Sequence, residues 1–470
     1  MESTLPTSPS YTSSFELLID ERQGRLAKLL GEITATGARV KGLDVEESTS
    51  GRIKVHLNCD MINSSHREEV IAVLQNHRGV EMTNISDATF LAHRGGKIQI
   101  QAKYPIRNRD DLSRAYTPGV ARVCQHIHKN PSRASSLTMK SNSVAVVTDG
   151  TAVLGLGDIG PAAALPVMEG KAVLFKQFGN VDAIPIALDA HEVDDIVAHI
   201  KAIAPGFGGI NLEDISAPRC FEIEDRLRAE LDIPVFHDDQ HGTAIVALAG
   251  LTNALKVVGK KIENVRIVVS GVGAAGSAII KLLLSQGASD IIAFGRSGPL
   301  IRTQTEGMHE SRRWLAEHTN KKLFDGTLVE AIKDADVFIG VSTGGLLKNE
   351  DVAQMKNDAI VFALANPTPE IDPIFAAQHV GVVATGRSDF PNQINNVLAF
   401  PGLFRGILDA KISEITVELL RITALAIASV IDESELTPHY IIPGIFDQRV
   451  AGAVSRAVRK AVAAKERNAS

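Results

Sequence analysis

The chain has few cysteines, few aromatic side chains and no excess of positive charge. Its 470 residues include three widely spaced cysteines, Cys59, Cys124 and Cys220, with no CxxC pattern, and 4% aromatic residues. Scattered thiols of odd number argue against a disulfide framework or a zinc–thiolate site and favour reduced thiols in a cytosol. Because the formal net charge is -6, the chain offers no strongly basic surface, and we expect no nucleic-acid partner.

Long apolar runs are also missing. The longest, around Ile422 to Ile431, is too short to span a bilayer, and the N-terminal MESTLPTSPSYTSS has neither a basic region nor an apolar one. We therefore expect a cytoplasmic protein without a membrane segment and with a disordered tail over residues 1–13. A chain of 470 residues exceeds what one core usually supports, which predicts two or three domains.

Residues 14–91 alternate strand and helix patterns in a compact order. Two amphipathic helices are predicted over residues 24–37 and 64–77, and Ser64 or Ser65 is predicted to cap the second. Strands are predicted over residues 14–19, 38–48, 52–61 and 80–90. The resulting βαββαβ order is the ferredoxin-like arrangement.

This segment resembles the ACT domain, a regulatory module that binds small effectors, often amino acids, at paired interfaces. Gly24 and Leu26 stand where that family has a ligand-loop glycine and leucine, whereas Gln23 replaces the usual proline. The resemblance implies an effector site near the loop at Gln23 and Gly24. The alternative is a ferredoxin-like module that serves dimerisation alone.

Two short apolar runs further along the chain each end in a pair of acids. INLEDI carries Glu213 and Asp214 after a predicted buried strand, and IPVFHDDQHGT carries Asp238 and Asp239. A carboxylate at the mouth of an apolar strand is costly unless a cation offsets its charge. The two pairs therefore predict a shared hard divalent ion such as Mg²⁺ or Mn²⁺.

Two other interpretations of these acids stay open. Turns that follow strands are often acidic, so both pairs could be ordinary solvated strand ends. His237 and His241 flank the second pair at a spacing of four and would suit zinc, but the neighbouring acids favour a harder ion.

A glycine-rich loop follows a β-branched run later in the chain. VRIVVS is followed at once by GVGAAG and then by the helical pattern SAIIKLLLSQG. This order predicts a dinucleotide-binding loop in which glycines allow a tight turn and the close approach of a pyrophosphate to a helix N-terminus. The predicted cofactor-binding residues are Gly271, Gly273, Ala274, Ala275 and Gly276. GLGDIG at residues 155–160 also matches, but it runs into Pro161 and follows no clean strand, so we discount it.

Six motifs from about residue 95 onward resemble those of the malic enzymes of the compact bacterial type. In chain order they are RDDLSRAYTPGVA, VVTDGTAVLGLGDIG, PVMEGKAVLFKQF, INLEDISAPRCFEIE, PVFHDDQHGTA and ATGRSDFPNQINNVLAFPG. The resemblance implies metal-dependent oxidative decarboxylation of L-malate to pyruvate and CO₂ with reduction of NAD or NADP. The ion, Mg²⁺ or Mn²⁺, would be held by Glu213, Asp214 and Asp239, and malate would chelate it through its C1 carboxylate and C2 hydroxyl.

The expected fold is an α/β chain in several parts. The predicted divisions are an ACT-like regulatory domain over residues 14–91, an α/β catalytic domain over 92–245, a Rossmann-type NAD(P)-binding domain over 246–400 and a C-terminal helical region over 401–470.

The resemblance assigns the proton transfers to Lys171 and Tyr116. Lys171 would remove the C2 hydroxyl proton, Asp238 would orient it, and Tyr116 would protonate C3 of the enol that remains after decarboxylation. A free lysine has a pKa of about 10.4, so Lys171 needs burial and a nearby dication to act as a base. Taken alone, Lys171 would be read as a surface charge and Tyr116 as a packed aromatic.

Substrate and cofactor contacts are predicted at four further positions. Asn366 and Asn396 match the family asparagines that donate hydrogen bonds to the substrate carboxylates without adding charge. Gly295 stands where many NAD-using members carry an acid, and Arg296 follows it. This pair removes a repulsion of the 2'-phosphate and offers a cation, which favours NADP over NAD.

Two other functions fit parts of the pattern: an amino-acid dehydrogenase without metal, or a catalytically silent effector-binding protein. We expect a homo-oligomer, either a dimer or a dimer of dimers. The sequence leaves open the effector, the physiological direction of the reaction and whether Tyr116 serves its own subunit or a partner.

Overall fold

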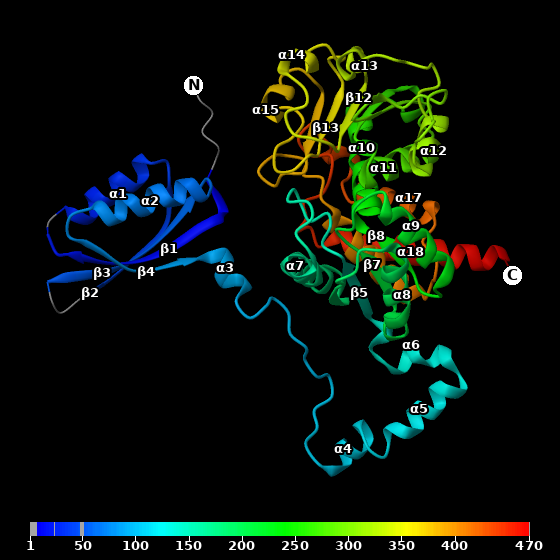
Figure 1. Cartoon of the computed structure of the whole chain (residues 1–470), viewed down its shortest axis with the longest axis horizontal. Coiled ribbons are helices and arrows are strands. Elements are labelled where there is room, and N and C mark those ends of the chain that lie inside the picture. The colour runs from blue at the N-terminus through cyan, green and yellow to red at the C-terminus, as the bar shows by residue number, and fades with distance from the viewer. Residues whose placement is uncertain (1–6, 23, 48–50, 470) are drawn as a thin grey trace. The chain divides into compact units, whose positions relative to one another are not determined.

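The computed structural model describes residues 7–22, 24–47 and 51–469, and the chain divides into two compact units, 1–100 and 101–470. Figure 1 shows both. Gln23 lies outside the described residues. Throughout the described ranges, no helix is both long enough and apolar enough to cross a membrane.

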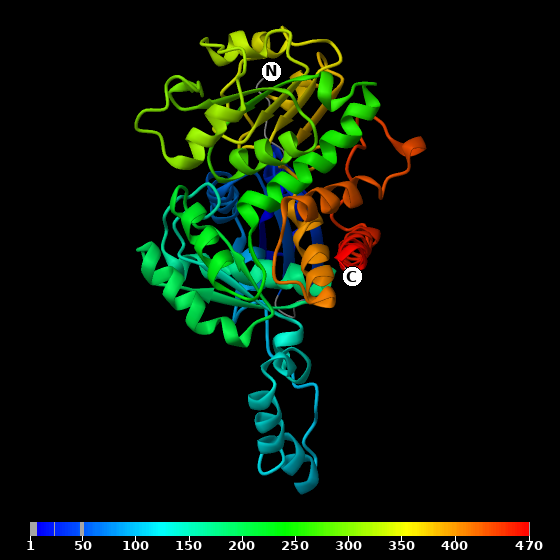
Figure 2. The ribbon, with the colours of Figure 1, turned by 90° about the vertical axis from the view of Figure 1, so that its right-hand side faces the viewer.

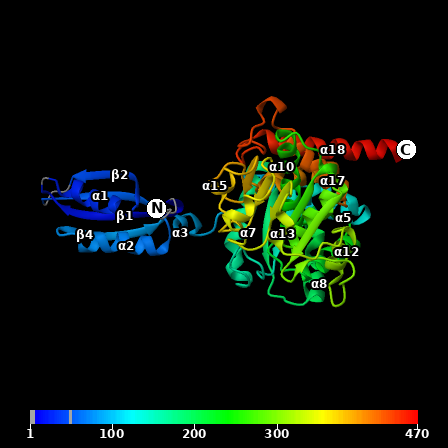
Figure 3. The same ribbon diagram turned by 90° about the horizontal axis from the view of Figure 1, so that it is seen from above.

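The first unit is a four-stranded antiparallel sheet with both of its longer helices on one face (Figures 1 and 3). Strand β1 alternates buried Phe15, Leu17 and Ile19 with more exposed residues, and these side chains pack against Leu29 and Val70 of the helices. The chain order is therefore βαββαβ, as predicted, with strand order β2-β3-β1-β4. Its elements are β1 (Ser8–Asp20), α1 (Arg25–Ala35), β2 (Arg39–Glu47), β3 (Arg52–Met61), α2 (Ser64–Asn76), β4 (Val80–Asp87) and α3 (Ala88–His93).

Three local predictions in this unit were wrong. Residues 8–13 are not a disordered tail, because β1 begins at Ser8 and pairs with β3. Helix α2 is capped by Asn63 rather than by Ser64 or Ser65, since the Asn63 side chain accepts a hydrogen bond of 2.9 Å from the backbone N–H of His66. The last strand ends at Asp87, whose side chain caps α3.

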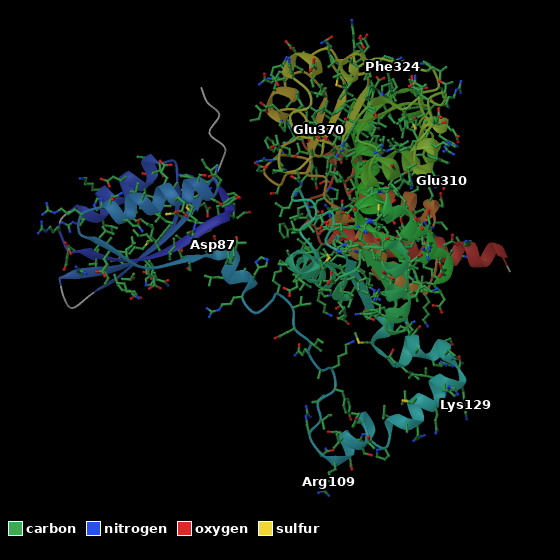
Figure 4. The ribbon with its side chains drawn as sticks, viewed as in Figure 1. Asp87, Arg109, Lys129, Glu310, Phe324 and Glu370 are labelled. Carbon is green, nitrogen blue, oxygen red and sulfur yellow. The ribbon has the colours of Figure 1, made fainter. Side chains whose placement is uncertain are left out.

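The second unit begins with a projecting segment, residues 101–137, which we call the arm (Figure 2). It contains α4 (Arg109–Ala115), α5 (Val120–Lys129) and α6 (Ala134–Leu137), and none of the residues in these three fully described helices is buried. Arg109 and Lys129, labelled in Figure 4, mark the start of α4 and the end of α5. In a single copy of the chain, every residue of these helices is therefore at least partly exposed.

A parallel sheet with strand order β6-β5-β7-β8 follows the arm. Helices cover both of its faces, because Val144 and Val146 of β5 join one hydrophobic cluster and Ala145 and Val147 join another. Its elements are β5 (Ser143–Thr148), α7 (Pro161–Gly179), β6 (Asp182–Ala187), α8 (Val193–Ile203), β7 (Gly209–Leu212), α9 (Arg219–Glu230) and β8 (Val235–His237).

A second sheet has the order β11-β10-β9-β12-β13-β14 and is parallel except for the short β11. Chain order reverses beside β9, as in dinucleotide-binding folds. Its strands are β9 (Arg266–Ser270), β10 (Asp290–Gly295), β11 (Gly298–Pro299), β12 (Val337–Gly340), β13 (Ile360–Ala363) and β14 (Val382–Thr385), and its helices are α10 (Thr243–Val257), α11 (Ala274–Ser285), α12 (Glu310–His318), α13 (Leu328–Ile332), α14 (Asn349–Val352) and α15 (Pro373–Ala376).

The C-terminal region is helical and packs back onto the two sheets of this unit. The helices are α16 (Phe400–Ala410), α17 (Val417–Ala428) and α18 (Arg449–Ala469). Phe400 and Phe404 of α16 pack against Phe175 of α7, with ring centroids 4.6 and 5.3 Å apart. One hydrophobic cluster thus joins both sheets and the C-terminal helices.

Candidate functional site

The two pairs of acids meet at the same edge of the first parallel sheet. Strands β7 and β8 are neighbours, with Leu212 opposite His237, so the residues that follow them emerge side by side. One carboxylate oxygen from each of Glu213, Asp214 and Asp239 lies within 4.8 Å of the other two. Asp239 also accepts a hydrogen bond of 3.0 Å from the backbone N–H of Asp214.

Burial makes the negative charge of this cluster expensive. Loss of solvent, reinforced by the carboxylate of Asp239, raises the pKa of Asp214 to about 7. The same causes raise the pKa of Glu213, although Lys171 opposes them. Among the described residues, Asp214 Oδ2 is buried without a hydrogen-bond partner. A cluster of oxygen ligands with unsatisfied charge fits a hard divalent cation.

Lys171 projects from α7 into this cluster. Its ammonium forms ion pairs with both Asp238 and Glu213, and its side chain is 9% exposed. Burial acts to lower the pKa of Lys171, but the neighbouring carboxylates, Asp238 first, outweigh it and hold the pKa above its usual value. Positive charge added to the acids would offset that field and move the pKa of Lys171 downward.

The two asparagines reach the site from different directions. Asn396 Nδ2 donates to Asp238 Oδ2 at 3.2 Å, so it lies next to the Lys171–Asp238 pair. Asn366 is exposed and follows β13 at the carboxyl end of the second sheet. Its backbone oxygen would lie 3.4 Å from a Cβ added to Gly155, which places the loop that carries Asn366 against the turn before α7.

Tyr116 is not brought to the acids in the same way. It caps the C-terminus of α4 on the arm and is 68% exposed. Figures 1 and 2 show α4 and α5 extending away from the strands β7 and β8 that carry the acids.

The glycines of the nucleotide loop differ in their surroundings: two are closely packed and one faces open space. A Cβ at Gly276 would lie 1.8 Å from the backbone oxygen of Gly271, and one at Gly271 would lie 2.5 Å from that of Val341. Gly273 would meet nothing within 4 Å, so this position leaves room for a ligand. Ala274 and Ala275 open helix α11 directly after it.

Two neighbouring features bear on the cofactor. Gly295 ends β10, beside β9, and an added Cβ would lie 3.3 Å from Val272 in the glycine loop; Arg296, which follows, is exposed. GLGDIG at residues 155–160 is a turn before α7; the preceding strand, β5, ends at Thr148, and an isolated bridge joins Val153 to Gly157.

Glu224 is a residue of this site that sequence reasoning missed. It is buried on α9 and accepts hydrogen bonds from Gln240 Nε2 at 2.9 Å and His241 Nε2 at 2.7 Å. These bonds anchor the π-helical turn Asp238–Gly242 that presents Asp239. The signal was an acid on the apolar face of a helix, since Glu224 is buried together with Cys220, Ile223 and Leu227.

The histidines do not join the acids as ligands in this structure. His241 is hydrogen-bonded to Glu224. Among the described residues, the group at this site whose ligand atoms lie close enough to share a metal ion consists of three carboxylates. This composition suits Mg²⁺ or Mn²⁺ better than zinc.

Comparison with known proteins gives concordant matches along the chain. A family model described as malic enzyme, N-terminal domain, matches residues 95–193 and 190–228, and one described as malic enzyme, NAD binding domain, matches residues 240–465. An NAD-dependent malic enzyme of Geobacillus stearothermophilus is 52% identical over 459 residues, which cover 97% of this chain and 95% of that protein.

Two further relatives extend the comparison. An NADP-dependent malic enzyme of Rhizobium meliloti is 45% identical over 386 residues, or 78% of this chain and 50% of that protein. The crystal structure of an NAD-dependent malic enzyme from Thermotoga maritima superimposes with a TM-score of 0.77 at 47% identity and covers 80% of this chain and 99% of that one.

Proposed function

The chain belongs to the malic enzyme family, and from this premise we propose that it converts L-malate to pyruvate and CO₂ while reducing NAD or NADP. The observation that carries the proposal is the joint placement of Glu213, Asp214 and Asp239 beside the buried Lys171–Asp238 pair. An amino-acid dehydrogenase, the alternative enzyme considered from the sequence, has no use for these three acids.

The acids would hold the metal. Glu213, Asp214 and Asp239 supply oxygen ligands of the kind that Mg²⁺ and Mn²⁺ prefer, and burial without a full set of partners leaves their charge uncompensated. Once bound, the ion supplies positive charge that attracts the C1 carboxylate and C2 hydroxyl oxygens of malate.

Lys171 is proposed as the base. Its neutral amine, which the charge of a bound dication would favour, would accept the proton of the C2 hydroxyl as a hydride leaves C2 for the nicotinamide. The contact with Asp238 keeps the side-chain nitrogen aimed at the acids. Asn396 donates to the same Asp238 oxygen that Lys171 contacts and would present an amide to the substrate, while Asn366 would offer a second amide from the loop after β13.

Tyr116 is proposed to serve the site of a second copy of the chain. Loss of the C4 carboxylate leaves an enol whose C3 needs a proton, and the phenol of Tyr116 can supply it. Within its own chain Tyr116 is exposed on an arm whose helices bury nothing. The arm also exposes Tyr104, Ile106 and Leu112, apolar surface that a partner subunit would cover.

Cofactor choice depends on the end of β10. Relatives include enzymes named for NAD and for NADP. Gly295 adds no charge beside the glycine loop and Arg296 is exposed next to it, which supports our prediction of NADP.

The first unit is proposed to be an ACT-like regulatory domain. A cavity of about 360 Å³ lies between the end of β1 and the start of α1 and is lined by Asp20, Gly24, Leu26 and Leu30 among others. Its size suits a small metabolite such as an amino acid. The loop predicted to bind an effector borders this cavity at Gly24, although Gln23 is outside the described residues.

Initial rates with malate, NAD or NADP, with and without Mn²⁺, test the proposed reaction. Replacing Asp239 by Asn keeps its shape but removes one of three charges, so the Mn²⁺ concentration for half-maximal rate should rise by about tenfold or more and the maximal rate should fall. Asp194→Asn, at an exposed acid on α8, is the control and should match the parent. Normal turnover by Asp239→Asn at low Mn²⁺ would overturn the metal assignment.

Mixed dimers test whether Tyr116 acts across subunits. The Lys171→Ala and Tyr116→Phe variants, each assembled only with copies of itself, should be nearly inactive with malate. If Tyr116 serves the partner, a mixed dimer isolated through two different tags has one intact site and should regain about half of the parent activity. Mixed dimers as inactive as their parents would place Tyr116 in its own subunit's site.

Replacing Gly295 by Asp tests the cofactor assignment. The new carboxylate should repel the 2'-phosphate and lower kcat/KM for NADP by about tenfold or more, while NAD use stays unchanged or improves. Ser289→Asp adds the same charge at the opposite end of β10 and should leave the ratio unaltered. An unchanged ratio in Gly295→Asp would place cofactor selection elsewhere.

Deleting residues 1–91 tests the regulatory domain. The motifs assigned to metal, malate and nucleotide lie in the second unit, so the truncated chain should oxidise malate at nearly the parent rate. Any response of the full chain to added amino acids should disappear with the deletion. A folded truncation without turnover would show that the first unit belongs to the active assembly.

A further inference from the structure

Glu370 is a fully buried carboxylate outside the acid cluster (Figure 4 labels its position). Its Oε1 accepts a hydrogen bond from the backbone N–H of Ser342 at 2.8 Å, and its Oε2 accepts one from that of Ala365 at 3.0 Å. Burial raises the pKa of Glu370, while these two hydrogen bonds act in the opposite direction. A buried acid whose two oxygens accept hydrogen bonds from two main-chain segments holds those segments together.

The two N–H groups belong to loops that leave neighbouring parallel strands. Ser342 lies two residues beyond β12, and Ala365 lies two residues beyond β13. Both loops therefore stand at the carboxyl edge of the sheet, the edge at which dinucleotides bind in folds of this kind.

The Ser342 loop supports the nucleotide loop. Ser342 Oγ lies 3.1 Å from Ser270 Oγ at the end of β9, and the neighbouring Val341 N–H donates to the Ser270 backbone oxygen at 2.9 Å. The backbone oxygen of Val341 is also the atom that leaves no room for a side chain at Gly271. A shift of Ser342 would therefore displace the glycine loop.

The Ala365 loop carries the substrate asparagine, since Asn366 is the next residue. A second set of bonds joins the same two loops, because Gly345 N–H donates to the Pro369 oxygen and Leu347 N–H to the Glu370 oxygen, each at 2.9 Å. The fit around the carboxylate is close: a Cβ added to Gly340 would lie 2.4 Å from the carboxyl carbon of Glu370.

We infer that Glu370 is a positioning residue that holds the Asn366 loop and the Ser342 loop in register, and so sets where malate stands relative to the nicotinamide cofactor. This inference rests on the proposed function. Glu370 itself touches neither substrate nor cofactor, because it is buried and both of its oxygens are engaged by backbone N–H groups.

Glu370→Gln is the direct test. The amide oxygen can serve one backbone N–H, but the NH₂ group then faces the other donor, so one loop is released. In the full-length enzyme, kcat/KM for malate should fall by about tenfold or more, and the Kd for NADPH or NADH, followed by its fluorescence, should rise. Gly340→Ala should produce the same two changes, because its new Cβ would displace the Glu370 carboxylate.

Asp336→Asn is the matched control. Asp336 is a buried carboxylate at the opposite edge of the same sheet, just before β12, and accepts a hydrogen bond of 2.9 Å from the backbone N–H of Arg266. Asp336→Asn should lower Tm while leaving kcat/KM for malate and the dinucleotide Kd within about twofold of the parent, because it disturbs no loop at the carboxyl edge.

The outcomes separate this inference from the proposed function. If Glu370→Gln lowers Tm as Asp336→Asn does but leaves kcat/KM for malate and the dinucleotide Kd unchanged, Glu370 is a structural residue and the inference is wrong. If Glu370→Gln does not fold, Gly340→Ala decides by the same two measurements. A parent enzyme that does not oxidise malate would instead refute the proposed function, while the dinucleotide titration would still test the Ser342 side.

Discussion

Negative charge gathered at the carboxyl ends of β7 and β8 is the constraint on which the site depends. Glu213, Asp214, Asp238 and Asp239 share one small region, and Lys171 is the cation that the structure places among them. Burial, together with the repulsion of neighbouring carboxylates, raises the pKa of Asp214 to about 7. Such an arrangement persists because the surrounding fold is stable enough to impose it, which leaves a strong attraction for a divalent ion.

The surrounding structure supplies that stability through helices on both faces of the sheet. Successive residues of β5 belong to two different hydrophobic clusters, so side chains pack against both faces of the strand. Glu224 then fixes the turn after β8 through Gln240 and His241. The acids are thus presented by backbone that has little freedom to spread them apart.

The sequence was most predictive where local pattern and topology agree. Acids after two buried strands could be paired in advance, because the carboxyl ends of neighbouring parallel strands share an edge, and the glycine loop between β9 and α11 could be recognised from its flanking strand and helix. Asn63, and neither of the two serines that follow it, caps α2, because a cap is decided by which side chain meets the free N–H.

Long-range partners could not be read from the sequence in this way. Glu370 bonds to backbone 28 and 5 residues away, and nothing in its local motif distinguishes it from a surface glutamate. Tyr116 lies in a well-defined motif, yet the motif says nothing about which copy of the chain it faces. Exposure of the arm, a property of the folded molecule, raises that question.

The π-helical turn that presents Asp239 has a mechanical consequence. It runs without a break into α10, most of whose residues are buried and which packs against α11, the helix that opens at the glycine loop. Asp238 and Asp239 are therefore continuous with a helix that packs on the nucleotide fold, with no linker between them along this path. Any rotation of the nucleotide fold that carries α10 with it must also move Asp239. Such a rotation would therefore change the position of Asp239 relative to Glu213 and Asp214.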